Sequence, residues 1–323
     1  MLFYSILETR LKRRFILLII LLLAQGCQFS DHPISNKSSV EPLNTIAWID
    51  REGHVEPINI PMRNYIYAQL SPDSKQVALN SRDESSDIWI FDLNLRSLRR
   101  LTLDPSSNIG PLWAPDGRLA YTRVIHDIQE LAVQAADRSA PAELLSILSD
   151  NAKYPTSFSA DGRTLIYHTS TFGYDMWSLS FDGADKTTQQ LLANPDQRET
   201  NGALSPDGNW IAYESDETGQ LEIFVSPFPD IESNRIQVSS GGGSRPRWHP
   251  DGSELLYINQ NEPALTGALM SVSINTNSGF NNTTPVLIFE NNFIAPNAGR
   301  QVYDISADGQ RFLMIQNTEQ MNR

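Results

Sequence analysis

The sequence predicts an all-β fold, a six-bladed β-propeller in which N- and C-terminal strands share the closing blade. Two observations lead to this prediction. A short turn signature occurs six times, and its successive Asp residues lie 43, 45, 46, 44 and 57 residues apart, which is the size of a four-stranded propeller blade. The chain also has half a unit at each end. No segment shows a long helical period of apolar residues.

Each copy of the turn signature reads Ser-Pro-Asp-Gly or a close variant of it. Proline sets φ for the second position of a type I turn, Ser and Asp accept local hydrogen bonds, and glycine takes the positive φ that reverses the chain into a hairpin. We therefore expect the six equivalent Asp residues to belong to the scaffold and not to a catalytic carboxylate pair. The copies are residues 70–74, 113–117, 158–162, 204–208, 248–252 and 305–309.

After each turn the pattern predicts three more strands, which complete a blade with the strand that leads into the turn. A short apolar strand comes first, at residues 76–79, 118–121, 164–167, 210–213, 254–257 and 311–314. A third strand with alternating polarity follows, at residues 87–91, 175–179, 222–225 and 269–272. The fourth is expected at residues 99–102, 190–192 and 235–238.

The two ends of the chain are expected to complete one blade together. Only nine residues follow Met314, too few for two more strands. Residues 46–50 match the third strand of the repeat, residues 55–58 can form the fourth, and residues 51–54 turn between them. Pairing of these strands with the C-terminal ones would close the ring and leave no free sheet edge.

The N-terminal part of the chain has the layout of a secretory signal. Residues 10–14 form a basic cluster, residues 15–24 form an apolar run, and a glycine stands directly before Cys27, the single cysteine. The apolar run is shorter than the roughly 18–20 residues that span a membrane as a helix. The stretch resembles a bacterial lipoprotein signal, in which the cysteine is lipidated and becomes the mature N-terminus. Ala24 and Gln25 depart from the residues that this signal usually has there.

We expect Cys27 to carry a lipid that holds the protein to the cell envelope, facing the periplasm. An uncleaved signal-anchor and a simple secretory signal are the alternatives. Gln28 follows the cysteine where Asp would direct retention in the inner membrane, and by family analogy this favours the outer membrane. The expected parts are residues 1–26 (signal peptide), 27–43 (lipid anchor and flexible tether), 44–316 (propeller) and 317–323 (polar tail).

The charge of the chain excludes one class of partner. It carries 25 basic and 38 acidic side chains, a formal net charge of −13, and residues 1–26 hold four of the basic and one of the acidic groups. Without residues 1–26 the balance is 21 minus 37, or −16. A body this acidic repels phosphate backbones, so we expect no nucleic-acid partner and take the charge as an aid to solubility. One cysteine cannot make an internal disulfide.

The Pro-Asp-Gly repeats and the Asp-Ile-Trp third strands resemble the TolB-like, WD-repeat-like propellers of bacteria. Longer runs that carry the resemblance are residues 46–53, 215–219, 241–248 and 303–313. The resemblance covers about residues 44–316 and implies the six-bladed fold, which hosts many functions. TolB itself has an α/β domain ahead of its propeller, where this chain has a short tether, so a TolB-equivalent role is not implied. The same runs resemble extracytoplasmic propellers of larger bacterial receptors, and a truncated relative of these is an alternative.

The sequence contains no catalytic or metal-binding motif. A propeller peptidase needs a Gly-x-Ser-x-Gly elbow, and residues 242–246 lack its final glycine and suit a turn. The five histidines show no ligand spacing, and His249 stands where other turns have Ser, which predicts a local hydrogen bond. We expect no cofactor, no bound metal and no enzymatic activity.

The connections that enter each blade, opposite the Pro-Asp-Gly turns, vary in sequence and are the expected recognition surface. The alternative for the candidate residues there is structural, namely salt bridges between blades and tyrosine packing. The candidates are Arg198, Glu199, Arg245 and Arg300, with Tyr65 and Tyr154 as stacking or hydrogen-bonding partners.

The expected function is that of a monomeric, non-catalytic lipoprotein that binds a protein, peptide or glycan of the cell envelope. The alternative is a propeller enzyme, such as a lactonase, lyase or glycan hydrolase, with its site in the central channel. Ionisable pairs in the channel would favour the enzyme, whereas a channel walled by turns and uncharged side chains would favour binding.

Overall fold

A computed structural model describes residues 43–83, 85–145, 152–170, 174–182, 186–260, 267–276, 279–291 and 301–317. The predicted signal peptide, the lipid site Cys27, most of the tether and of the polar tail, and Arg300 lie outside these residues. Within the described part all regular structure is β-strand. No helix there has the length and apolar character that crossing a membrane requires.

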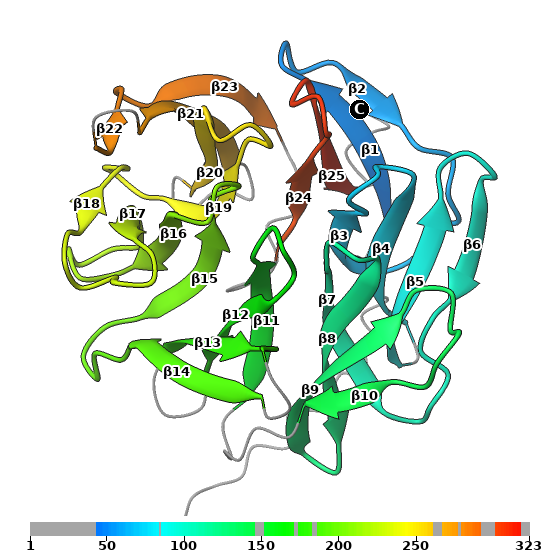
Figure 1. Cartoon of the computed structure of the whole chain (residues 1–323). Coiled ribbons are helices and arrows are strands. Elements are labelled where there is room, and N and C mark those ends of the chain that lie inside the picture. Colours follow the sequence, from blue (N-terminus) through cyan, green and yellow to red (C-terminus); the bar gives the residue numbers. More distant parts are fainter. Residues whose placement is uncertain are drawn as a thin grey trace, which may run out of the picture. The chain divides into compact units, whose positions relative to one another are not determined.

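Six antiparallel sheets surround a central axis as the blades of a propeller, with one innermost strand from each blade around the middle (Figure 1). The predicted fold class is confirmed. From the inner strand outward, the blades are β3 (Tyr65–Leu70), β4 (Gln76–Arg82), β5 (Ser86–Asp92) and β6 (Ser97–Arg100) in blade 1; β7 (Ser107–Trp113), β8 (Arg118–Ile125), β9 (Ile128–Ala135) and β10 (Glu143–Leu145) in blade 2; β11 (Lys153–Phe158), β12 (Thr164–Thr169), β13 (Met176–Ser180) and β14 (Thr187–Leu192) in blade 3; β15 (Glu199–Leu204), β16 (Trp210–Ser215), β17 (Glu222–Pro227) and β18 (Ile236–Gln237) in blade 4; β19 (Ser244–Trp248), β20 (Glu254–Gln260), β21 (Gly267–Asn275), β22 (Asn281–Asn282) and β23 (Val286–Asn291) in blade 5; and β24 (Tyr303–Ile305), β25 (Arg311–Asn317), β1 (Asn44–Asp50) and β2 (Val55–Pro57) in blade 6.

Blade 5 is longer than the others, which accounts for the widest spacing in the repeat. Its third strand, β21, pairs with the short strand β22 through Ile274 and Asn275, and then with β23, which takes the place of the fourth strand. The extra hairpin lies at the outer edge of the blade, so the innermost strands keep the sixfold arrangement.

Blade 6 joins the two ends of the chain as predicted. Strands β1 and β25 are antiparallel neighbours over seven residue pairs, from Asn44 with Asn317 to Asp50 with Arg311. In this register Trp48 lies opposite Leu313. The strands that follow the N-terminal tether therefore complete the sheet that the C-terminal strands begin.

The turns use the Asp side chain as the sequence predicts. In blade 3, the Ser159 hydroxyl donates to the Asp161 carboxylate at 2.6 Å, and the same oxygen accepts the Arg163 amide at 3.0 Å. The Ser159 hydrogen bond lowers the pKa of Asp161, so this carboxylate is an ionised acceptor within the turn. His249 takes the place of Ser in blade 5, with Nδ1 2.6 Å from Asp251 Oδ1, and its predicted local role is confirmed.

The hydrophobic core is divided into six clusters, one at each interface between neighbouring blades. The cluster between blades 6 and 1, for example, brings Ile46, Leu313 and Ile315 against Tyr65 and Leu79. Because no blade buries its apolar faces alone, each interface depends on the presence of the next blade.

Leu313→Ala tests the closing seam. Leu313 is fully buried in the cluster between blades 6 and 1, and truncation of such a side chain costs about 2–5 kcal/mol. We expect urea unfolding to show a loss of free energy of unfolding in this range. Val286→Ala, at a residue that is 59% exposed on β23, serves as the control and should change stability by less than about 0.5 kcal/mol. A similar small loss for Leu313→Ala would contradict the closing role.

Candidate functional site

The innermost strands share an irregularity at equivalent positions. The pairing of β3, β7, β11, β15 and β19 with their neighbours shifts register between Tyr65 and Tyr67, Ile109 and Leu112, Pro155 and Ser157, Thr200 and Ala203, and Ser244 and Arg247. At these shifts Gly110, Asn201 and Arg245 have φ of 66°, 53° and 57°, and each lies six residues before the Asp of its turn. A β-bulge re-aims side chains and is common beside functional sites.

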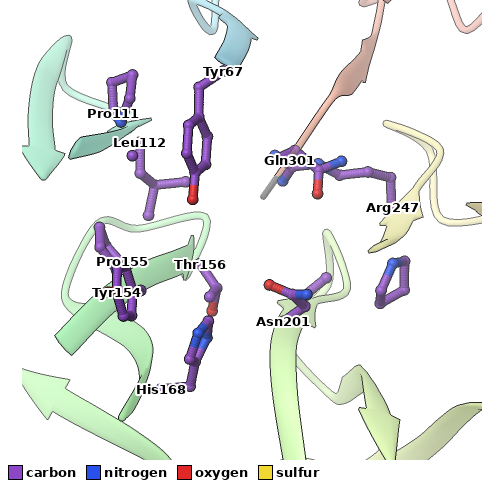
Figure 2. A pocket seen from close by; sticks show the side chains of 13 residues that line it. Tyr67, Pro111, Leu112, Tyr154, Pro155, Thr156, His168, Asn201, Arg247 and Gln301 are labelled. Carbon is purple, nitrogen blue, oxygen red and sulfur yellow. The ribbon is translucent and has the colours of Figure 1, made fainter. Parts of the chain in front are cut away.

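The bulges surround a small cavity at the end of the channel that lies opposite the turns. This central cavity has a volume of about 30 Å³, and each of the six blades contributes to its wall. Figure 2 shows Tyr67, Asn201, Arg247 and Gln301 around a common space. Proline and tyrosine rings form much of the rest of the wall, including Tyr154. Its lining residues Gly110, Tyr154, Asn201 and Pro246 belong to the connections predicted to carry recognition.

Arg247 brings a positive charge to the wall of the central cavity. Its side chain is 16% exposed and Nε lies 3.9 Å from Asp304 Oδ1. The Asp304 oxygens are already used, since Oδ2 accepts the Leu70 amide at 2.8 Å and Oδ1 the Ile305 amide at 3.0 Å. Burial raises the pKa of Asp304, against the effect of Arg247 and of these amides. Among the described residues the Arg247 side chain has no hydrogen-bond partner, and its Nε is buried.

His168, on β12, is a buried neutral imidazole beside the same cavity. It is 5% exposed, and its ring stacks on Tyr154 with centroids 5.4 Å apart. Burial, assisted by the positive charge of Arg198, lowers the pKa of His168 to about 3. Its Nδ1 is buried and has no hydrogen-bond partner among the residues that the structure describes. Sequence reasoning gave this histidine no role because it belongs to no ligand-spacing motif.

Two predicted recognition residues, Arg198 and Glu199, lie between blades 3 and 4. The Arg198 guanidinium lies 4.4 Å from the centre of the Tyr174 ring. Glu199 is 1% exposed, accepts the Asn194 amide at 3.2 Å and lies 3.7 Å from Arg235. Burial raises the pKa of Glu199. Arg198 therefore has the tyrosine packing named as the alternative, and Glu199 has an ion pair within blade 4. Arg198 also acts electrostatically on His168.

The other predicted recognition residues are divided between packing and the cavity. Arg245 is 3% exposed, its amide donates to Glu214 at 2.5 Å, and its carbonyl accepts the Tyr303 hydroxyl at 2.8 Å. Tyr65 is fully buried and its hydroxyl donates to the Pro61 carbonyl at 2.7 Å. Tyr154 alone of the described candidates lines the central cavity. A direct contact of these residues with a partner stays a prediction.

The glycine-rich string at residues 241–243 has a structural explanation. The buried Glu222 carboxylate accepts the amides of Gly241 at 2.8 Å and Gly242 at 3.0 Å, and also the Ser239 hydroxyl at 2.5 Å. Ser244 donates to the Ile258 carbonyl at 3.3 Å. The loop is thus wrapped around a carboxylate, and its serine is engaged with the neighbouring strand.

Asp50, Glu52 and His54 form a group of possible metal ligands within the described residues, with ligand atoms within 4.8 Å of one another. They lie on the exposed hairpin between β1 and β2. Asp50 accepts the amides of Glu52 at 3.1 Å and of His54 at 2.8 Å, and also pairs with the His54 ring at 2.8 Å. These are the bonds of an Asp-centred turn, so the group forms part of the hairpin.

Comparison with known proteins places this fold in a family. A family model described as the TolB beta propeller domain matches residues 119–323, and the chain belongs to this family. Among curated proteins it is similar to the Uncharacterized protein Atu1656 of Agrobacterium fabrum, with 23% identity over 217 residues, 54% of this chain and 73% of that protein. It is also similar to the Tol-Pal system protein TolB of Ruthia magnifica, with 30% identity over 81 residues, which span 25% of this chain and 19% of that protein.

Solved structures agree in fold at low sequence identity. A putative TolB from Agrobacterium tumefaciens has a TM-score of 0.67 at 17% identity and covers 85% of this chain and 98% of its own. TolB from Acinetobacter baumannii has a TM-score of 0.58 at 16% identity, with coverage of 76% and 64%. An oligogalacturonate lyase in complex with manganese has a TM-score of 0.52 at 15% identity, with coverage of 87% and 83%. The fold is thus shared by TolB proteins and by an enzyme.

His168→Asn should change how stability depends on pH. Folding lowers the pKa of His168 from 6.5 to about 3, so between these values the unfolded chain binds more protons, and stability falls as the pH is lowered, by up to about 1.4 kcal/mol per pH unit. In urea unfolding from about pH 4 to 6, the variant should lose this part of the slope. His126→Asn, at an exposed turn, should keep the wild-type slope. Equal slopes in wild type and His168→Asn would refute the buried neutral state.

Proposed function

We propose that this protein is a non-catalytic binding scaffold of the cell envelope, which recognises a partner at the loop-bearing end of its channel. The observation that carries the proposal is the central cavity, to which all six blades contribute, five of them at or next to the bulges of their inner strands. Arg245 is held at a φ of 57°, which is strained for a long side chain, and such strain is concentrated at ligand-binding and active sites.

A protein or peptide partner is favoured over a glycan. The cavity is much smaller than the roughly 300–1,000 Å³ of sites that enclose a whole small molecule, so it suits one projecting group of a larger partner. The surrounding proline and tyrosine rings are the kind of apolar wall that packs against side chains. Membership of the TolB β-propeller family supports a place in the envelope, with the lipid on Cys27 and the outer membrane as the proposed anchor and site.

An enzyme with its site in the channel is the second candidate, because the channel does contain an ionisable pair, Arg247 and Asp304. The bonding of Asp304 argues against it. Both carboxylate oxygens accept backbone amides, and one of these amides belongs to the neighbouring blade 1. Asp304 is thereby fixed in the blade interface, and within the described part of the chain no second carboxylate lines the cavity beside it as acid–base hydrolysis would require.

Site-specific photo-cross-linking in intact cells tests the proposed binding face. A photoreactive amino acid at Asp196, exposed in the connection that enters blade 4, should capture an envelope protein. The same photoreactive amino acid in place of Asp116, which is exposed in the Pro-Asp-Gly turn of blade 2, should capture no such protein. Position 116 lies at the opposite end of the channel. Equal capture at both positions, or recovery of lipoprotein-processing and chaperone proteins alone, would count against the proposal.

Cys27→Ser tests the anchor. The thiol is the expected site of lipid attachment, so the variant should lose labelling by a radioactive fatty acid and leave the membrane fraction. The single cysteine makes the result specific, since no other thiol remains. Unchanged labelling or unchanged membrane association would contradict the lipoprotein assignment, and the latter alone would indicate a protein anchor.

A further inference from the structure

In three of the six blades the side chain four residues before the turn Asp accepts a hydrogen bond from the next blade, whereas Leu112 and Ala203 stand at this position in blades 2 and 4. Gln69 accepts the amide of Trp113 in the next blade at 2.7 Å, and Ser157 accepts that of Leu204 at 3.1 Å. Asp304 does the same for Leu70 in blade 1. Three different acceptors thus tie the inner strand of one blade to the inner strand of the next.

Arg247 occupies this same position in blade 5 and cannot take this role. A guanidinium has five N–H donors and no acceptor, so it cannot receive an amide from blade 6. It makes no hydrogen bond to a described residue, and it faces the central cavity. Its charge is held near Asp304 at 3.9 Å, which balances the cation without using its donors.

His168 is a second exception of the same kind. It follows Tyr167 on the second strand of blade 3, as Asn80 and Thr122 follow Leu79 and Tyr121 in blades 1 and 2. Asn80 donates to the Asn108 carbonyl of the next blade at 3.0 Å, and Thr122 donates to that of Lys153 at 2.5 Å. His168 makes no such bond within the described residues, and it also lines the central cavity.

Arg247 and His168 are thus polar side chains that make no hydrogen bond to the next blade among the described residues. Both line the central cavity. We propose that the central cavity binds the terminal carboxylate of a peptide, with Arg247 as the cationic donor and His168 as the second polar contact. The proposal rests on the binding role proposed above and specifies the group that is bound. Arginine pairs with a carboxylate through two parallel N–H donors, which gives both affinity and orientation.

The size of the cavity and the residues that line it favour the C-terminal end of a peptide as the ligand. A volume of about 30 Å³ admits a group of roughly one or two water molecules in size, such as a carboxylate, and excludes a sugar ring. Pro111, Leu112, Pro155 and Pro246 line the same space and would contact the carbon atoms next to the carboxylate. The acidic body of the protein disfavours ligands with many negative charges, so a single carboxylate is preferred.

Calorimetric titration of the full-length protein in detergent tests the proposal. The probe is acetyl-Ala-Ala-Ala with a free carboxylate, compared with the same peptide as a C-terminal amide. We expect saturable binding of the acid, at least tenfold weaker binding of the amide, and at least tenfold weaker binding of the acid to Arg247→Gln. His168→Asn should weaken binding by about two- to fivefold, and the acid should shift the NMR resonances of the wild-type His168 ring.

Arg51→Gln is the matched control. Arg51 is also a partly buried arginine between blades 5 and 6, paired with Glu254, but it does not line the central cavity, so its loss should leave binding unchanged. Equal affinity for acid and amide, equal affinity of Arg247→Gln and wild type, or binding of galacturonate but not of the peptide acid would overturn the proposal.

The titration and the cross-linking together separate this inference from the proposed function. If the peptide acid does not bind while envelope proteins are captured at position 196, the carboxylate site is refuted and the binding face stands. If the peptide acid binds as expected but no envelope protein is captured, the carboxylate site stands and the scaffold role fails.

Discussion

The pairing of β1 with β25 is the constraint on which the rest of the structure depends. Each hydrophobic cluster lies between two blades, so an open ring would leave apolar faces exposed at both ends. Seven residue pairs across the seam prevent this, and they join segments that are more than 250 residues apart in the sequence. Closure also fixes the width of the channel, because the positions of the six inner strands follow once the ring is complete. The geometry of the central cavity is thus a consequence of the seam.

Within the closed ring, function is expected where blades differ from one another. The turns are nearly equivalent in all blades, and their Asp side chains accept the local hydrogen bonds that the sequence predicts, as in blades 3, 4 and 6. The bulges interrupt the pairing of the inner strands at one level of the channel. The side chains at this level are therefore not constrained by a regular partner on the neighbouring strand. At this level the wall combines aromatic rings, an amide, a neutral imidazole and a guanidinium. The six similar blades therefore form a cavity wall whose residues differ from blade to blade.

The sequence predicted the fold closely because the turn signature has a local cause. The Ser, Pro, Asp and Gly residues specify the reversal within five positions, and the spacing then defines the blades. The bulges had only a weak signal. Gly110 and Asn201 are residues that tolerate positive φ, whereas Arg245 at the equivalent position gives no such indication. Glu199 and Tyr65 were expected in exposed connections, and they are buried because the inner strands begin earlier than the hydrophobic pattern shows. His168 and Arg247 had no motif, since their significance depends on hydrogen bonds that polar counterparts in some other blades make and they do not.

The choice between binding and catalysis depends on how Asp304 is used. A catalytic carboxylate needs an oxygen free to exchange a proton with a substrate, in a geometry that the protein holds open. Asp304 instead has both oxygens occupied by amides, one of them from blade 1, and its displacement would loosen the interface beside the closing seam. The Arg247 guanidinium next to it has no such structural role. Among the described residues the Arg247 side chain has an ion-pair partner but no hydrogen-bond partner, so a ligand can engage its donors without breaking a bond of the scaffold. The Asp304 carboxylate is bound to backbone amides, whereas the Arg247 guanidinium has no hydrogen bond to a described residue. This difference favours recognition of an anionic group over hydrolysis.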